Sequence, residues 1–358
     1  MPRWFLEPGA DGRHDVLALS RLVGDLSQLA GVTPVVYQEG AGRGVSAYQV
    51  RTGGGLRFAI RVDRGLEIAE AEYLGVPYGW QSGVGPVHPA FYETEEDGWL
   101  RLYDGGLMTM GGLDQIGEPC EDLGRRFGLH GRLANLPAVE CGYRIDWRRS
   151  EIQIWGTLRQ LTPTKEFLEL HREVVAPIGG TVIDITDRVT NRGDRPAAHM
   201  ILYHFNLGYP LLDEGCRFIA PVQKTEGWDH LSKDHLAVSR TVPGMTGEEY
   251  LFGHQVMATD GWTTAALLNP QLNGGSFCAI RYKQDTLPYL WQWISLRPGT
   301  WVMGIEPANG DIRGRAAARQ RGTLSELEPG QEVEYRVQLQ FGSGPEAVTR
   351  IISEAGLP

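Results

Sequence analysis

The chain has 358 residues, of which 42% are hydrophobic and 22% are charged, so it is long enough to bury a large core. Its 34 Lys and Arg residues against 44 Asp and Glu residues give a formal net charge of −10. This acidic balance argues against nonspecific binding to nucleic acid or to anionic membranes.

The first elements of the chain are short and interrupted. Leucines and a valine between Leu19 and Leu29 have the spacing of one helical face, but Gly24 interrupts them, so a helix there is left open. We expect residues 1–35 to add a strand or helix segment to the main body. The glycines of 40–44 precede an alternating stretch, 45–51, which predicts a hairpin turn and not a nucleotide-binding loop before a helix.

Alternation of apolar and polar residues is the main signal in the rest of the chain. It predicts strands, each with one face on a core and one in water, over 151–155, 167–175, 181–189, 277–282 and 332–341. Gly and Pro residues are spread throughout, which is typical of many short strands joined by turns. Pro345 and Gly356 favour a closing helix between them. We therefore expect one antiparallel all-β unit over 1–358, with few short helices.

The cysteines and histidines do not form a metal-binding pattern. No CxxC pair exists among Cys120, Cys141, Cys216 and Cys278, so we expect buried free thiols and no metal site. His199 and His204 are five residues apart and would point to opposite faces of a strand, so His199 is interpreted as structural. With no signal-like segment and no apolar run of membrane-spanning length, we expect a cytoplasmic protein.

Glu306 is the carboxylate that best fits a catalytic role. It ends the apolar run 301–305 and directly precedes Pro307. Neighbours of this kind remove water from a carboxylate, and desolvation raises its pKa toward the range of a general base. A single acid is weak support, because most Glu residues are solvated.

Two histidine segments could complete the site with Glu306. His204 lies among aromatic residues and close to Asn206. A general acid must be protonated, and Glu306 could supply the acidic neighbour that this requires. His130 is followed by Gly131 and Arg132 after a Gly-rich run, 105–117, although a surface turn would also explain it.

These segments together resemble the galactose mutarotase-like (aldose 1-epimerase-like) superfamily, in particular an uncharacterised branch of it. The resemblance runs from about Arg61 to Phe341. It implies a β-sandwich of the supersandwich kind, an open cleft, a sugar substrate and no cofactor. It casts Glu306 as the base and His204 as the acid. It also implies the following substrate-binding residues: His130, Arg132, Arg64, Gln115, Asn206, Asp229 and Gln292.

Some of these assignments have structural alternatives. Arg64 could equally be a surface charge at a strand end, and Asp229 is placed differently from the Asp of galactose-specific members. Alternation puts Trp291 and Trp293 on one face and Gln292 on the other, and we expect Gln292 to face the site.

The expected activity is that of an isomerase of the aldose 1-epimerase type, which opens and closes a sugar ring at the anomeric carbon. A noncatalytic sugar-binding or regulatory protein and a glycoside-processing enzyme are the alternatives. A hydrolase of the usual kind needs two carboxylates across the bond, and only Glu306 stands out. The expected partner is a small sugar, with no nucleic acid or membrane, and a homodimer is left open.

Overall fold

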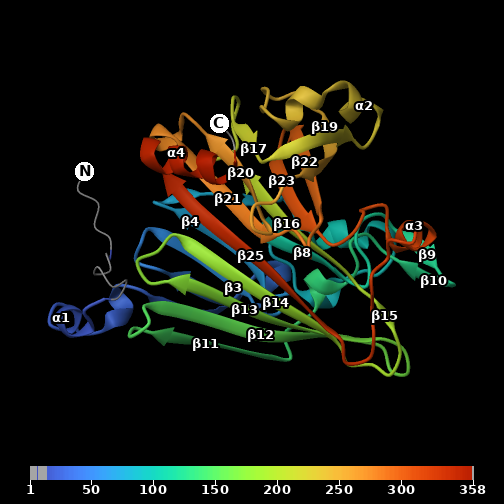
Figure 1. The fold of residues 1–358 in the computed structure, drawn as a ribbon. Helices are drawn as coiled ribbons and strands as arrows, with labels where there is room; N and C mark the ends of the chain where they lie inside the picture. The colour runs from blue at the N-terminus through green and yellow to red at the C-terminus, as the bar shows by residue number, and fades with distance from the viewer. Residues whose placement is uncertain (1–5, 7–13, 357–358) are drawn as a thin grey trace.

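The computed structural model describes residue 6 and residues 14–356. The structure is built on two large sheets whose strand pairings are antiparallel (Figure 1). The strands of the first sheet, in spatial order, are β1 (Gly31–Val36), β2 (Ser46–Arg51), β3 (Leu56–Arg61), β4 (Glu67–Tyr73), β8 (Met108–Leu113), β16 (Met200–Gly208), β23 (Thr300–Ala308), β22 (Tyr289–Arg297), β19 (Glu249–Val256) and β18 (Val222–Gly227), with β5 (Val76–Pro77) paired to β4.

The second sheet is built from long strands of the middle and end of the chain. In spatial order they are β11 (Glu140–Asp146), β12 (Glu151–Leu161), β13 (Phe167–Pro177), β14 (Val182–Asn191), β25 (Glu332–Ser343), β21 (Ser276–Lys283), β20 (Trp262–Asn269) and β17 (Arg217–Ile219). Short two-stranded pairings join β6 (Trp80–Gln81) to β7 (Gly105–Gly106), β9 (Cys120–Asp122) to β10 (Arg125–Phe127), and β15 (Ala197–Ala198) to β24 (Glu326–Leu327).

Helices are short and lie outside the sheets. The α-helices are α1 (Val16–Ser20), α2 (His230–Asp234), α3 (Arg315–Gln320) and α4 (Pro345–Glu354). The 3-10 helices are η1 (Leu26–Gln28), η2 (Gly40–Gly42), η3 (Pro89–Phe91), η4 (Glu96–Leu102), η5 (Leu133–Asn135), η6 (Leu236–Ser239) and η7 (Leu272–Gly274). None of the described helices is long and apolar enough to cross a membrane.

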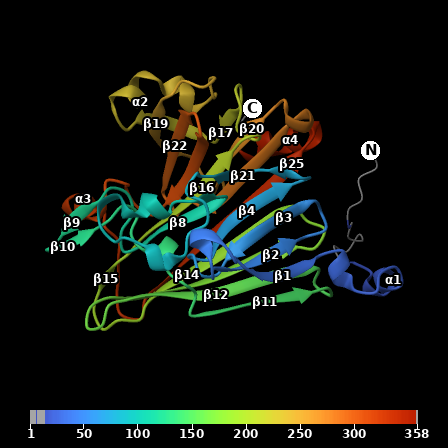
Figure 2. The same ribbon diagram turned by 180° about the vertical axis from the view of Figure 1, so that it is seen from behind.

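The core lies between the two sheets. Seen from behind, β1 to β4 lie over β12 and β14 (Figure 2). One cluster of buried apolar side chains includes Phe205 and Ile305 from the first sheet and Ile185 and Leu339 from the second. Side chains alternate along β16 and β23, so Phe205 and Ile305 point into this core and the residues next to them point to the opposite face of the sheet.

A charged group is also buried in this core. Arg172 donates to both oxygens of Asp187, at 2.8 and 2.6 Å, and the Tyr203 hydroxyl donates to Asp187 at 2.6 Å. Arg172 and Asp187 are 1% and 0% exposed. Because β13 and β14 supply the ion pair and β16 supplies the tyrosine, the group ties the second sheet to the first.

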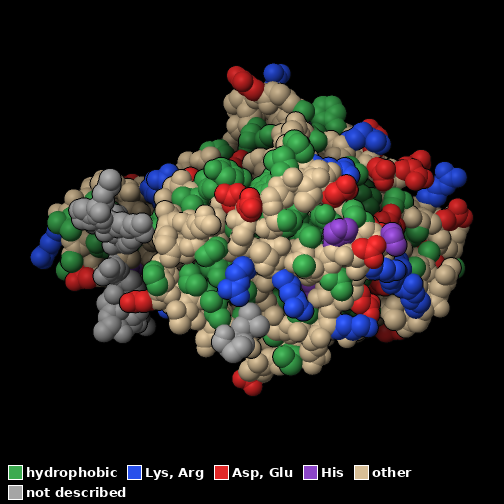
Figure 3. Space-filling view, turned by 90° about the horizontal axis from the view of Figure 1, so that it is seen from above, with side chains coloured by type: hydrophobic (Ala, Val, Ile, Leu, Met, Phe, Trp, Pro, Cys, Tyr) green, Lys and Arg blue, Asp and Glu red, His purple; other side chains and the backbone are tan. Residues whose placement is uncertain are grey.

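The region of α3 is held by ion pairs at the surface. The guanidinium groups of Arg315 and Arg319 donate to the Asp122 carboxylate of β9 at 2.7 and 2.8 Å. Charged side chains of both signs gather at this end of the molecule when it is seen from above (Figure 3). The contacts anchor the segment that follows β23.

The predicted strands over 151–155, 167–175, 181–189, 277–282 and 332–341 are confirmed, as is the closing helix. The loop at 40–44 joins β1 to its antiparallel neighbour β2, as a hairpin turn should. The helical spacing near Leu19 yields only α1 and η1, with a break between them. Residues 1–5 and 7–13 of the expected N-terminal segment lie outside the described residues.

His199 and the cysteines behave as the sequence suggests, with one difference. The imidazole of His199 contacts the Leu113 carbonyl at 2.9 Å and the Tyr335 hydroxyl at 2.8 Å, which is a structural role. All four cysteines are free, but Cys141 is exposed and Cys120 is half-buried; the buried thiols are Cys216 and Cys278.

Candidate functional site

Two neighbouring strands of the first sheet bring His204 and Glu306 together. In the register of β16 with β23, Phe205 lies opposite Ile305, and both point into the core. His204 and Glu306 flank these residues and therefore share the other face. The Nε2 atom of His204 lies 3.1 Å from the Oε1 atom of Glu306. The residues that the sequence suggested as acid and base are thus in contact.

The pair is buried, and burial controls its charge. The side chains of His204 and Glu306 are 6% and 3% exposed. Burial raises the pKa of Glu306 to about 8 and lowers the pKa of His204 to about 4. The expectation that Glu306 keeps His204 protonated is therefore wrong for the resting protein, because burial disfavours the charged form of both side chains.

The neutral pair still holds the proton that acid–base chemistry needs. A neutral carboxyl beside a neutral imidazole has the same number of protons as a carboxylate beside an imidazolium. One proton transfer over the 3.1 Å contact between Glu306 and His204 interconverts the two forms.

Buried polar atoms without partners gather at this pair. Nδ1 of His204 and Nδ2 of Asn206 have no hydrogen-bond partner among the described residues, and Oε1 of Glu306 has none beyond its 3.1 Å contact with Nε2 of His204. The other side of the Asn206 amide is occupied, since Oδ1 accepts a hydrogen bond from the Tyr103 hydroxyl at 2.6 Å. An unpartnered buried polar atom costs roughly 1–3 kcal/mol. Such atoms at neighbouring positions on one face indicate a place where a polar ligand binds.

Gly304 keeps space open beside the pair. A Cβ atom at this position would lie 2.5 Å from Oε1 of Glu306 and 3.1 Å from Cε1 of His204. Side chains alternate along β23, so any larger residue at position 304 would point at the same face as Glu306. Glycine therefore allows both side chains to occupy their positions.

Aromatic rings surround the pair and explain its desolvation. The imidazole of His204 lies 5.6 Å from the ring of Tyr103 and 5.8 Å from the ring of Trp293. Trp99 stacks on Tyr103 at 4.5 Å, and Trp80 lies 5.7 Å from Tyr103. Sequence reasoning missed Trp80, Trp99 and Tyr103. The density of aromatic residues between positions 78 and 103 was the available signal.

His130 adds a neutral donor next to His204. Its ring lies 6.0 Å from the His204 ring and 4.8 Å from Trp99. Burial, followed by the nearby His204, lowers the pKa of His130 to about 3. Its Nδ1 atom accepts a hydrogen bond from the Gly117 N–H at 3.2 Å, so the ring proton is on Nε2. Nε2 can therefore donate to a ligand.

Gln292 is not part of this site, and the expectation that it faces the pair is wrong. Trp291 is the residue opposite Glu306 in the register of β22 with β23, so Gln292 points to the other face. There its Nε2 atom donates to the Ser239 carbonyl at 3.1 Å, and its Oε1 atom contacts Nε2 of His254 at 3.0 Å. Both ends of the Gln292 amide are therefore engaged on the face of β22 that does not carry Glu306.

Arg64 and Gln115 also have internal roles. Arg64 is 1% exposed and donates from its three guanidinium nitrogens to three backbone carbonyls at 2.9–3.2 Å. Gln115 is 0% exposed and accepts a hydrogen bond from the Arg315 N–H at 2.8 Å. These hydrogen bonds hold the surrounding loops in place, so the polar groups of both side chains are engaged inside the protein.

Asp229 has a structural role, whereas Arg132 is exposed. Asp229 caps α2, because its carboxylate accepts from the Ser232 N–H at 2.7 Å. Arg132 is exposed on the turn after His130, and its backbone N–H donates to the Gly112 carbonyl at 2.9 Å. Contact of Arg132 with a substrate stays a prediction.

Comparison with known proteins places the chain among mutarotase-like folds. The family described as "Domain of unknown function (DUF4432)" matches residues 42–341. No curated protein matches the chain. A solved structure from Klebsiella pneumoniae, named "putative aldose 1-epimerase", is 25% identical and superimposes with a TM-score of 0.87 over 92% of this chain and 90% of that chain.

More distant solved structures show the same fold. A galactose mutarotase-like protein from Clostridium acetobutylicum is 13% identical, with a TM-score of 0.66 over 88% of this chain and 99% of that one. The galactose 1-epimerase of Lactobacillus acidophilus is 12% identical, with a TM-score of 0.56 over 88% of this chain and 100% of that one. The fold is thus the galactose mutarotase-like β-sandwich that the sequence suggested.

Proposed function

Because the chain belongs to the DUF4432 family and has a galactose mutarotase-like fold, we propose that it is an isomerase that interconverts the anomers of a reducing sugar. The observation that carries the proposal is the buried contact between His204 and Glu306, with unpartnered polar atoms on His204 and Asn206. A scaffold of this kind hosts different functions, so the proposal depends on these residues and not on the fold alone.

In the proposed reaction, Glu306 and His204 move two protons in opposite directions. The carboxylate form of Glu306 takes the proton of the C1 hydroxyl, and the imidazolium form of His204 gives a proton to the ring oxygen. The bond between C1 and the ring oxygen breaks, its electron pair goes to the ring oxygen, and C1 becomes a carbonyl carbon. Rotation about the C1–C2 bond and the reverse transfers close the ring on the other face. Each positioned acid or base contributes about 10²–10⁴-fold.

Burial of the pair suits this sequence of steps. After ring opening, Glu306 carries a proton and His204 is neutral, and this is the form that burial favours. The neutral pair is also the resting form, so the charged pair that starts the reaction is the less stable arrangement and bond breaking returns the pair to the favoured one. In the proposal, Nε2 of His130 and Nδ2 of Asn206 donate hydrogen bonds to sugar oxygens and hold the ring in place.

Anomer exchange measured by NMR saturation transfer tests the proposal. The wild-type protein at catalytic concentration should accelerate exchange of at least one sugar in a panel of aldoses and ketoses, in proportion to protein concentration. If no sugar is accelerated but calorimetry shows binding, the noncatalytic sugar-binding alternative replaces the proposal. Release of new reducing ends from glycosides would favour a glycoside-processing enzyme instead.

A further inference from the structure

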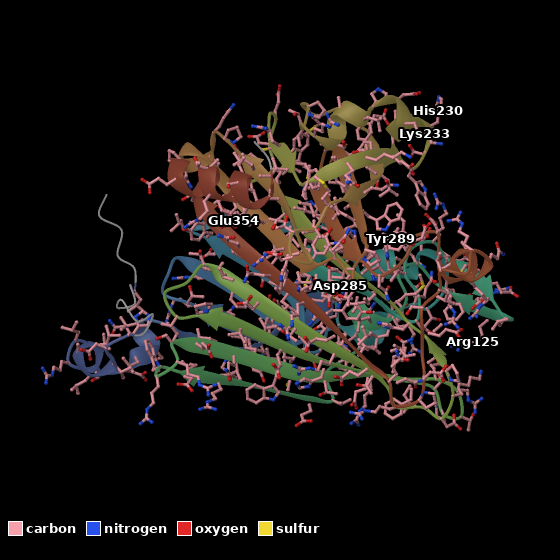
Figure 4. The ribbon with its side chains drawn as sticks, in the orientation of Figure 1. Arg125, His230, Lys233, Asp285, Tyr289 and Glu354 are labelled. Atoms are coloured by element: carbon pink, nitrogen blue, oxygen red, sulfur yellow. The ribbon has the colours of Figure 1, made fainter. Side chains whose placement is uncertain are left out.

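A cavity lies on the same strand, β22, that borders the candidate site. Its volume is about 370 Å³, and it lies where β18 and β19 end next to the start of β22. Pockets that hold small ligands occupy about 300–1,000 Å³. Trp228, Tyr289 and Trp291 form its aromatic walls, and its lining includes neither His204 nor Glu306. In Figure 4, Tyr289 lies below α2, on the side of the molecule that carries α3.

The aromatic walls are held in fixed positions. Trp291 meets the ring of Trp228 edge-on at 5.6 Å and lies parallel to Tyr289 at 6.3 Å. The indole N–H of Trp291 donates to the Gly310 carbonyl at 3.3 Å. A Cβ atom on Gly253 would lie 2.9 Å from this indole, so glycine there leaves room for it. Flat, rigid faces of this kind bind the apolar C–H faces of sugar rings.

Polar groups at the cavity match hydroxyls better than an anion. The guanidinium of Arg313 lies 4.6 Å from the ring centre of Trp228 and donates to Asp311. Asp311 also accepts from Arg321 at 2.8 Å, and Glu226 is a second carboxylate in the lining. Among the described residues, Arg313 is the one Lys or Arg in the lining, and it is already paired with Asp311, so no free guanidinium or ammonium group is available for a phosphate or a carboxylate ligand. Donors and acceptors beside aromatic faces fit a neutral saccharide.

The cavity and the candidate site lie along the same face of β22. Trp293, Trp291 and Tyr289 are alternate residues of that strand and share a face. Trp293 lies 5.8 Å from the ring of His204, and Trp291 is opposite Glu306. From Trp293 to Tyr289 the strand advances by roughly 14 Å, which is longer than a single sugar ring.

We propose that this cavity is a second sugar subsite, and that the substrate is a disaccharide or longer saccharide. Its reducing-end ring lies at His204 and Glu306, and the adjoining ring lies against Trp228 and Tyr289. The inference rests on the proposed function for the identity of the first ring. Bonds between the rings are unchanged in the reaction.

Calorimetry with the full-length Glu306→Gln protein tests the subsite, because this variant should bind a sugar without converting it. Glucose, galactose, maltose, cellobiose and lactose are the probes. We expect at least one disaccharide to bind tenfold or more tightly than the monosaccharide at its reducing end. Trp228→Ala, added to this protein, should abolish that difference, and Arg313→Ala should reduce it at least threefold. Circular dichroism and thermal melting confirm that each variant is folded.

Trp262→Ala is the matched control, since Trp262 lies 4.5 Å from the guanidinium of Arg281 and is outside the cavity lining. It should leave the preference for the disaccharide unchanged. The subsite is excluded if no disaccharide is preferred, or if the preference survives both Trp228→Ala and Arg313→Ala.

Anomer exchange by the wild type separates the subsite from the proposed function. Disaccharide binding that depends on Trp228 without accelerated exchange would support the subsite and reject the isomerase. Accelerated exchange of monosaccharides without any preference for disaccharides would support the isomerase and reject the subsite.

Discussion

At the scale of residues, the protonation of one buried pair determines what the candidate site can do. His204 and Glu306 share a single exchangeable proton in a place that disfavours charge on either side chain. The neighbouring Tyr103 does not supply a charge but fixes the amide of Asn206 through its hydroxyl. The reactivity of the site is thus set by burial and by hydrogen-bond direction.

The pH dependence of kcat/KM should report this pair. As the pH falls through about 4, His204 becomes protonated while Glu306 is still a neutral carboxyl. As the pH rises through about 8, Glu306 loses its proton while His204 is still neutral. Only the form with one shared proton is competent, so we expect a plateau between these values and about a tenfold loss per pH unit beyond them. Anomer exchange from pH 3.5 to 9.5 measures the profile. An alkaline limb already below pH 6 would contradict the neutral-pair assignment.

At the scale of elements, the buried group of Arg172, Asp187 and Tyr203 joins the two sheets. We predict that Asp187→Ala lowers the free energy of unfolding by about 3–5 kcal/mol, because the charge of Arg172 stays buried without its partner. Chemical denaturation measures the change.

Asp184→Ala is the matched control on the same strand. Asp184 is half-buried and accepts one hydrogen bond, from Gln338 at 2.7 Å, so its loss should cost less than about 1.5 kcal/mol. Equal effects of the two substitutions would show that the buried ion pair contributes nothing specific.

Elements with a polar face were predictable from the sequence, and fully buried ones were not. β25 alternates because one of its faces is in water. β8 is buried along its whole length and contains Gly111 and Gly112, so it shows no alternation of apolar and polar residues, and Thr109 is its one β-branched residue. The helix that the spacing near Leu19 left open forms only as the short α1 and η1, because Asp25 begins a new turn after α1 has ended.

The candidate site was predictable in its residues but not in its geometry. His204 and Glu306 stood out individually, while the register that brings them together depends on pairing between strands about 100 residues apart in the sequence. Alternation separated Gln292 from Trp291 and Trp293 correctly, but it could not tell which face meets Glu306. Burial makes His204 neutral where a charged imidazole was expected, and it follows in part from Trp80, Trp99 and Tyr103, in a segment whose sequence has no periodic pattern.

At the scale of the whole molecule, we propose that residues 1–358 fold as one unit. The strands of the two sheets are interleaved along the chain: β16 of the first sheet lies between β14 and β25 of the second in sequence. One apolar cluster also draws on both sheets. A cut at any point between β1 and β25 would therefore divide at least one sheet.

Limited proteolysis and calorimetry test this unity. We expect a single cooperative unfolding transition and no pair of stable fragments, because neither half would retain a complete core. Two fragments that each refold and melt cooperatively would show that the chain has separate domains.

The measurement that tests the central claim most directly is anomer exchange by the Glu306→Gln variant. Gln keeps the size of the side chain but cannot accept the C1 proton, so exchange of a sugar that the wild type accelerates should fall at least 100-fold, with binding changed by less than about threefold. Glu334→Gln on β25, where Glu334 pairs with Arg336, should have no effect on either quantity. Exchange at the wild-type rate in Glu306→Gln would show that Glu306 is not the base.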